Sequence, residues 1–275
     1  MPEVIFTGPA GRIEGRYQPS KKKGAPIAII LHPHPQFGGT MNNQIVYDLF
    51  YDFVERGFSV LRFNFRGVGR SQGAFDHGTG ELSDAAAALD WAQTVNPDAR
   101  ACWIAGVSFG AWIGMQLLMR RPEVEGFISI GAMANRYDFS FLAPCPSSGL
   151  FVHGSEDRVS PVKEVMSVIE RVKTQKGIKI EHAIIEGANH FFEGKIEDLM
   201  TAVGGYLDGR VGVKGSDGPV EEPETAEAEV EEQPLAIEDA SGGELPHELS
   251  DEADAIDDDA ADEEADGDEA ASRQA

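Results

Sequence analysis

The sequence predicts an α/β fold in which a mostly parallel sheet carries helices on both faces. Short apolar runs of strand length alternate along the chain with longer segments of helical periodicity, the pattern of parallel strands joined by helical crossovers. The runs at 26–31 and 101–107 are continuously apolar, as expected of strands that are buried on both faces.

The elements follow from these runs and from the Gly, Pro and Asn residues between them. Strands are expected at 4–7, 12–17, 26–31, 59–65, 101–107, 126–130, 149–153 and 179–185. Helices are expected at 44–56, 81–94, 109–121, 162–174 and 192–207. The first two strands flank a Pro-Ala-Gly turn, which favours an antiparallel pair at one edge of the sheet. Asn42 and Asn43 are candidate caps for the first helix, and Gly57 ends it.

Charge divides the chain into two parts. The 275 residues carry a formal net charge of −24, and 24 of the 47 acidic residues lie in 211–275 beside only two basic ones. That segment has no aromatic residue, so it cannot bury enough apolar surface to offset the entropy of ordering the chain. We therefore expect one folded domain at 1–210 and a disordered acidic tail at 211–275, with a basic protein as the tail's possible partner.

Cysteine usage and the amino-terminal sequence suggest a location. The two cysteines form no disulfide framework and lack the spacing of a zinc site. The first residues show no secretory signal, and no stretch is long enough to span a membrane. We expect a cytoplasmic protein without a metal or cofactor, and without a nucleic-acid or membrane partner.

The most informative motif is Gly106-Val-Ser-Phe-Gly110, which joins an apolar strand to a helix. A Gly-x-Ser-x-Gly turn in this setting places Ser108 on a sharp bend at the carboxyl end of the strand, and its glycines let strand and helix pass closely. The helix that follows presents free N–H groups and its positive dipole end to developing negative charge. These are the requirements of acyl transfer, so Ser108 is the candidate nucleophile.

A serine nucleophile needs a base to take its proton and an acid to hold that base in the correct tautomer. His190 is the candidate base because it lies in a loop, 186–192, between a strand and the last helix. Other histidines have less suitable settings: His77, His153, His182 and His247.

For the acid, the turn after strand 149–153 offers both Glu156 and Asp157. The order Ser108, Asp157, His190 is the chain order that this type of fold requires.

The developing oxyanion is expected to meet two backbone N–H groups, those of Phe109 and of one residue in the loop after strand 26–31. Because the two prolines of that loop cannot donate, His34 is the first choice, with Gln36 and Phe37 as alternatives.

We expect substrate contacts at Phe37, Gly38 and Arg66. Arg66 and Arg70 are alternatively partners for the fold's own carboxylates. The glycines of 67–73 follow a strand, but their G-x-G-x-x-x-G spacing and the lack of a placed acidic residue favour a tight active-site turn over a nucleotide site. His32 and His34 have the His-x-His spacing of some metal-binding pairs, but the sequence places no further metal ligand beside them.

Five segments together resemble the small bacterial α/β-hydrolases related to dienelactone hydrolases: 32–43, 63–73, 106–110, 153–157 and 187–192. The resemblance covers about residues 3–208. It implies a lidless α/β-hydrolase fold and a triad of Ser108, Asp157 and His190, with the acid at the last position of His153-Gly-Ser-Glu-Asp157. Dienelactone hydrolases themselves carry cysteine at the elbow, where this chain has Ser108, and the segment after about residue 210 has no counterpart in them.

The expected function is that of a serine hydrolase that cleaves a small soluble carboxylic ester, thioester or lactone through an acyl-enzyme. The short link between the strands at 126–130 and 149–153 leaves no room for a large lid, so we expect an open site. The competing interpretation is an inactive binding or scaffold protein that keeps the fold and uses the acidic tail to meet basic partners.

Overall fold

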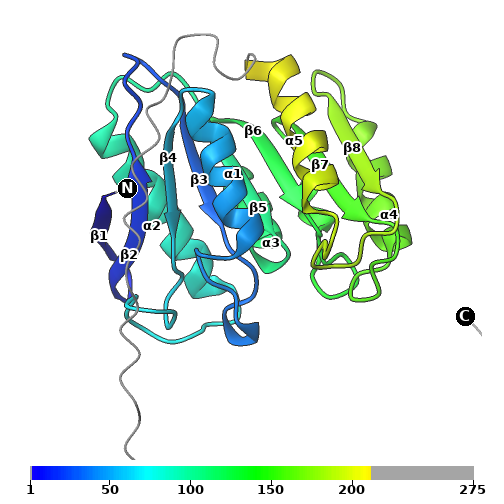
Figure 1. Cartoon of the computed structure of the whole chain (residues 1–275), viewed down its shortest axis with the longest axis horizontal. Helices are drawn as coiled ribbons and strands as arrows, with labels where there is room; N and C mark the ends of the chain where they lie inside the picture. The colour runs from blue at the N-terminus through cyan, green and yellow to red at the C-terminus, as the bar shows by residue number, and fades with distance from the viewer. Residues whose placement is uncertain (1, 212–275) are drawn as a thin grey trace, which may run out of the picture. The chain divides into compact units, whose positions relative to one another are not determined.

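Eight strands form one sheet in residues 2–211, the part of the chain that the computed structural model describes (Figure 1). Their order is β1-β2-β4-β3-β5-β6-β7-β8. The bounds are β1 (Glu3–Gly8), β2 (Gly11–Gln18), β3 (Ile27–Leu31), β4 (Ser59–Phe63), β5 (Cys102–Val107), β6 (Val124–Ile130), β7 (Ser148–Gly154) and β8 (Ile180–Ile185). Strand β2 pairs antiparallel with β1 and β4, and all other pairs are parallel. The predicted antiparallel edge and parallel body are both confirmed.

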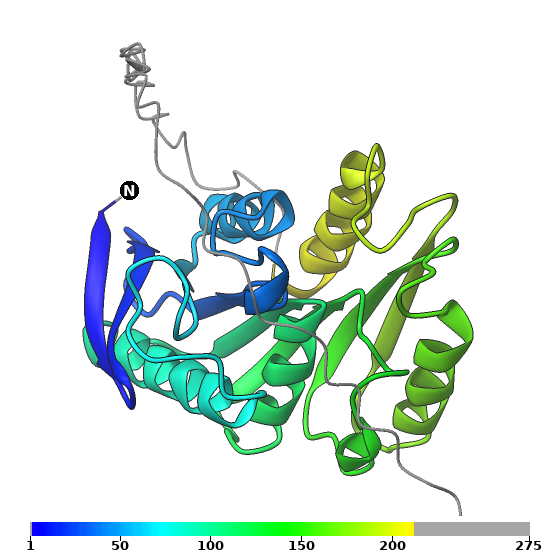
Figure 2. The ribbon, with the colours of Figure 1, turned by 90° about the horizontal axis from the view of Figure 1, so that it is seen from below.

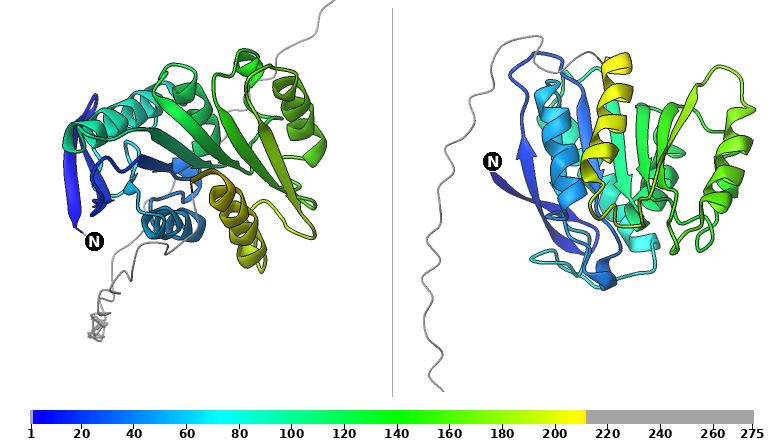
Figure 3. Two further views of the ribbon diagram at one scale, coloured as in Figure 1. Left: turned by 90° about the horizontal axis from the view of Figure 1, so that it is seen from above. Right: turned by 45° about the vertical axis from the view of Figure 1, so that its right-hand side comes forward.

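Helices cover both faces of this sheet, as predicted. They are α1 (Gln44–Glu55), α2 (Thr79–Val95), α3 (Phe109–Leu118), α4 (Val162–Lys173) and α5 (Ile196–Val211). Figure 2 shows α1 and α5 on one face, with α2, α3 and α4 on the other, and Figure 3 shows the same layers from two further sides.

The continuous apolar runs are explained by these two layers. In β3, Ile27, Ile29 and Leu31 pack into the core beneath α2 and α3. Ala28 and Ile30 point the other way, into the core beneath α1 and α5. Every residue of β3 is therefore buried, because successive side chains of a strand face opposite sides of the sheet.

The helix caps and helix starts in the structure agree only in part with those predicted from the sequence. Asn43 caps α1, its side-chain oxygen accepting the N–H groups of Ile45 and Val46. Asn42 instead accepts a hydrogen bond from Arg62 Nη1. The predicted start of the last helix at 192 is wrong, because the helix begins at Ile196.

Helix α5 begins later in the chain than predicted because of the backbone conformation of the residues that precede it. Phe192 has φ 54° and Gly194 has φ 67°, and this left-handed conformation cannot continue a right-handed helix. The ring of Phe192 is fully buried in the core beneath α1 and α5. Packing of this ring therefore decides the local conformation, which the helical pattern at 192–207 did not reveal.

The link between β6 and β7, residues 131–147, contains one short 3₁₀ helix, η2 (Ser140–Leu142), and no larger insertion. The described part of the chain thus has no helical lid at this position. Within the same range, no helix has the length and hydropathy needed to cross a bilayer. Helix α5 runs one residue past the predicted domain boundary at 210, and the predictions for the acidic segment concern residues outside the described range.

Candidate active site

Ser108 lies on the bend between β5 and α3. Its dihedral angles are φ 55° and ψ −112°, a conformation that costs a non-glycine residue on the order of 1–3 kcal/mol. The bend depends on the two glycines of the motif. A Cβ on Gly110 would clash with the carbonyl oxygens of Leu31 and His32, and one on Gly106 would clash with the backbone of Gly110. The close approach predicted from the motif is therefore present.

Three sequence-predicted residues meet in a single hydrogen-bonded chain. His190 Nε2 lies 2.9 Å from Ser108 Oγ, and His190 Nδ1 lies 2.7 Å from Asp157 Oδ2. All three residues are buried. Because the Asp157 carboxylate can only accept, His190 Nδ1 carries the proton and the lone pair of Nε2 faces Ser108. We call this arrangement the Ser-His-Asp chain.

The carboxylate of Asp157 is held at both oxygens. Oδ1 accepts the N–H groups of Val159 at 2.9 Å and Ser160 at 2.8 Å, while Oδ2 faces His190. Burial opposes ionisation, but the hydrogen bonds from His190 and the Ser160 N–H outweigh it and hold the pKa of Asp157 below its ordinary value. Glu156 is exposed, so of the two candidate acids only Asp157 reaches His190.

A second histidine, His153, contacts the same carboxylate. Its Nε2 lies 2.6 Å from Ser160 O and 3.2 Å from Asp157 Oδ2, and both of these atoms are acceptors. Nε2 therefore carries the proton. Nδ1 is buried and has no partner among residues 2–211, and burial lowers the pKa of the imidazole. His153 is thus a neutral donor to the turn that presents Asp157.

Sequence reasoning set His153 aside as a candidate base and assigned it no other role. Its spacing of four residues before the acid is the signal that could have identified it.

The loop after β3 lies against the first turn of α3. Gln36 N–H donates to His34 Nδ1 at 3.2 Å, and Phe37 N–H donates to His34 O at 3.1 Å, so both alternative donors are used within the loop. The N–H groups of His34 and Phe109 make no hydrogen bond to any residue in 2–211. These two N–H groups therefore have no partner in the described part of the protein, and the rings of the two residues pack 4.9 Å apart.

His32 fixes this loop to the sheet. Its Nδ1 lies 2.6 Å from Pro33 O, and its Nε2 accepts the Phe65 N–H at 3.0 Å. Burial lowers the pKa of His32 to about 4, so the ring is neutral with its proton on Nδ1. Both nitrogens are engaged, which leaves His32 no lone pair for the metal pair considered from the sequence. No cluster of three or more His, Cys, Asp or Glu side chains within 2–211 has the arrangement of a metal site.

Arg66 pairs with a carboxylate of the fold, the alternative that the sequence left open, and its expected substrate contact stays a prediction. Its Nε and Nη2 donate to the two carboxylate oxygens of Asp84 at 2.9 and 2.8 Å, and its backbone N–H also donates to Asp84. This bidentate pair is buried and raises the pKa of the guanidinium. It ties the turn after β4 to α2. Arg70 similarly pairs with Glu14, at 3.0 Å.

Phe37 and Gly38 occupy the outer end of the loop after β3. The Phe37 side chain is 80% exposed, and Gly38 has φ 79° with open space around its Cα. The expected substrate contacts at Phe37 and Gly38 stay a prediction.

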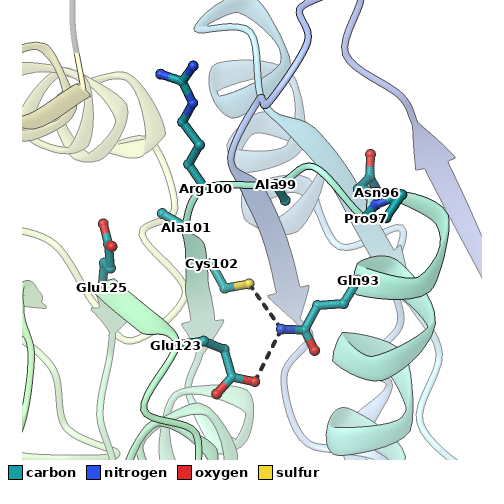
Figure 4. A pocket seen from close by; sticks show the side chains of 9 residues that line it. All are labelled: Gln93, Asn96, Pro97, Ala99, Arg100, Ala101, Cys102, Glu123 and Glu125. Carbon is teal, nitrogen blue, oxygen red and sulfur yellow. Dashed lines mark hydrogen bonds between the residues drawn. The ribbon is translucent and has the colours of Figure 1, made fainter.

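A cavity of about 200 Å³ lies elsewhere, at the amino end of β5 (Figure 4). Its lining residues are Gln93, Asn96, Pro97, Ala99, Arg100, Ala101, Cys102, Glu123 and Glu125. Gln93 bridges Cys102 and Glu123 there, and burial raises the pKa of the Cys102 thiol to about 11. Since Ser108 follows the opposite end of β5, this cavity is separate from the Ser-His-Asp chain.

The sheet order, the bend after β5, and the acid and histidine that follow β7 and β8 define the α/β-hydrolase class. Comparison with known proteins agrees. Residues 16–147 match the family model described as X-Pro dipeptidyl-peptidase (S15 family). A putative α/β hydrolase of unknown function from Agrobacterium tumefaciens is 70% identical, with a TM-score of 0.76 over 76% of this chain and 96% of that one.

Two further relatives extend the comparison. An uncharacterised protein of Rickettsia prowazekii is 51% identical over 211 residues, which cover 75% of this chain and 89% of that protein. A lidless serine hydrolase from Xanthomonas campestris is 30% identical, with a TM-score of 0.67 over 75% of this chain and 93% of that one. The chain belongs to the α/β-hydrolase family, among serine hydrolase homologues without a lid.

Proposed function

We propose that this protein is a serine hydrolase that cleaves small carboxylic esters, including thioesters and lactones, through an acyl-enzyme on Ser108. The observation that carries the proposal is the Ser-His-Asp chain, with distances of 2.9 and 2.7 Å between successive side chains. Nucleophile, base and orienting acid stand within hydrogen-bond reach of one another, which is the geometric requirement of nucleophilic catalysis.

In the first step, Ser108 Oγ attacks the ester carbonyl carbon while His190 Nε2 takes its proton. Asp157 stabilises the imidazolium that forms. The C–O bond to the alcohol then breaks, and His190 returns the proton to the leaving oxygen. In the second step, water attacks the acyl-enzyme with His190 again as base, which releases the acid and restores Ser108.

The oxyanion of each tetrahedral intermediate would lie between the N–H groups of Phe109 and His34. The assignment of His34 is supported by its unused N–H and by the internal bonds that engage Gln36 and Phe37. In serine proteases, loss of one such donor costs about 10²–10³ in turnover.

The choice of small esters rests on two supports. The link at 131–147 builds no lid or tunnel for a long chain in the described part of the protein. The sequence also resembles dienelactone hydrolases, although serine replaces their cysteine at the elbow. The competing proposal, an inactive scaffold, has less support because it leaves the strained conformation of Ser108 without a purpose.

A fluorophosphonate probe tests the proposal, since an activated serine attacks phosphorus and an ordinary serine does not. We expect one label per chain, mapped to the peptide that contains Ser108. Ser108→Ala should abolish both labelling and hydrolysis of 4-nitrophenyl acetate. Ser83→Ala, on the exposed surface of α2, is the matched control and should leave both unchanged. An unlabelled wild-type protein with no turnover would favour the scaffold.

A further inference from the structure

We propose that Phe37 and Phe191 form an aromatic clamp on two sides of Ser108, and that the ester cleaved there carries a compact aromatic ring. The inference rests on the proposed function and specifies its substrate class. Phe37 is 80% exposed and Phe191 is 63% exposed, more than any other large hydrophobic side chain in residues 2–211.

Both phenylalanines lie beside residues of the proposed reaction. The Phe37 ring is 4.7 Å from the ring of His34, whose N–H is the proposed oxyanion donor. The Phe191 ring is 5.4 Å from the ring of His190, edge to face at 86°. The two loops follow β3 and β8, whose carboxyl ends lie at the same edge of the sheet. The two exposed phenylalanines thus lie on the two loops that carry the proposed oxyanion donor and the proposed base.

The outward direction of Phe191 is built into its turn. The Asn189 side chain accepts the N–H groups of Phe191 at 3.0 Å and Glu193 at 3.2 Å. The next residue, Phe192, adopts φ 54° and buries its own ring completely. This turn therefore keeps one phenylalanine in the core and holds its neighbour beside His190 in solvent.

Aromatic contacts continue inward from Phe37. The His34 ring also packs against Phe75 at 4.8 Å and Phe109 at 4.9 Å. Phe109 in turn contacts a stacked pair, Trp112 and Tyr137, whose ring centroids are 4.3 Å apart. Phe75, Trp112 and Tyr137 are all partly exposed. One side of the loop after β3 is thus an aromatic wall.

An aromatic ring fits this wall better than an aliphatic group of equal size. Offset and edge-to-face ring contacts contribute beyond the area they bury, because the positive edge of one ring meets the negative face of another. A compact ring is favoured over a long acyl chain, since the described part of the protein has no lid to cover such a chain.

The test uses two pairs of esters that differ only in replacing phenyl by cyclohexyl. Methyl phenylacetate with methyl cyclohexylacetate tests a ring in the acyl group, and benzyl acetate with cyclohexylmethyl acetate tests a ring in the alcohol. The ratio of kcat/KM within a pair cancels differences in active fraction. We expect the wild-type protein to prefer the aromatic member of one pair about tenfold.

The variants Phe37→Ala and Phe191→Ala should each bring that ratio toward one. Ile5→Ala, which removes an exposed apolar side chain on β1, is the matched control and should keep the wild-type ratio. Fluorophosphonate labelling of each variant shows that Ser108 remains reactive.

Ratios near one in both pairs for a wild-type protein that hydrolyses methyl acetate would overturn the clamp while the proposed function stands. The clamp is also overturned if the variants keep the wild-type ratio but change the molar mass measured by light scattering, which would make the phenylalanines an interface between copies. A wild-type protein that is neither labelled nor active on methyl acetate would instead contradict the proposed function.

Discussion

Replacing Asp157 by asparagine should abolish turnover for a reason that the hydrogen bonds around this side chain specify. Oδ1 accepts two backbone N–H groups, from Val159 and Ser160, so an asparagine must place its carbonyl oxygen there. Its amide nitrogen then takes the position of Oδ2, 2.7 Å from His190 Nδ1. An N–H donor at that point requires Nδ1 to accept, which moves the histidine proton to Nε2.

That tautomer points an N–H at Ser108 Oγ, 2.9 Å away, and can no longer take the serine proton. In a serine protease, the same acid-to-amide change lowers kcat by about 10⁴. We expect a loss of the same order for Asp157→Asn on 4-nitrophenyl acetate. The two bonds to Oδ1 are kept, but the new amide N–H also faces the protonated Nε2 of His153, 3.2 Å from the position of Oδ2, so the melting temperature should fall moderately while the fold is retained.

Glu156→Gln is the matched control, since the neighbouring carboxylate is exposed and the hydrogen bond to His190 comes from Asp157. We expect it to change kcat less than tenfold. Measurements of kcat for both variants on the same ester, together with thermal melts, are sufficient to test this prediction. An Asp157→Asn protein that is folded and within tenfold of wild type would refute the tautomer argument and the assigned acid.

Three further predictions follow from the site and the charge distribution. His153→Leu removes the N–H that donates to Ser160 O in the turn that presents Asp157, so the carboxylate should be held less precisely and kcat should fall about tenfold with little change in KM. His153→Gln, which keeps an N–H donor, should restore most of the lost kcat. Burial lowers the pKa of His32 from 6.5 to about 4, so the folded state favours the neutral ring. The contribution of this ring to the free energy of unfolding is fully present above pH 6.5, and up to about 3 kcal/mol of it is lost as the pH falls toward 4. Urea unfolding between pH 7.5 and 4.5 should show this slope in wild type and in His77→Asn, but a smaller one in His32→Asn. Deleting 213–275 should leave the melting temperature and ester turnover unchanged, and a large fall in either would contradict the expectation that this segment is dispensable.

The sequence was sufficient to predict those elements that depend only on residues close together in the chain. The apolar runs predict the strands because a strand buried on both faces needs apolar side chains in both directions, and the glycines around Ser108 predict the bend because no Cβ fits there. The start of α5 could not be read in this way. Its helical pattern extends back to residue 192, but burial of the Phe192 ring holds that residue in a left-handed conformation.

The sequence by itself determined the order of nucleophile, acid and histidine along the chain. It also determined that these residues meet beyond the carboxyl ends of the strands, because parallel strands bring those ends together. The residues alone left Glu156 and Asp157 open, the family resemblance favoured Asp157, and the structure shows Asp157 facing His190. Only the tertiary structure decided that Arg66 binds Asp84 and that His153 lies beside the acid. The physical reason is that a side chain's direction in a turn depends on backbone angles, and these are set by contacts with residues far away in the sequence.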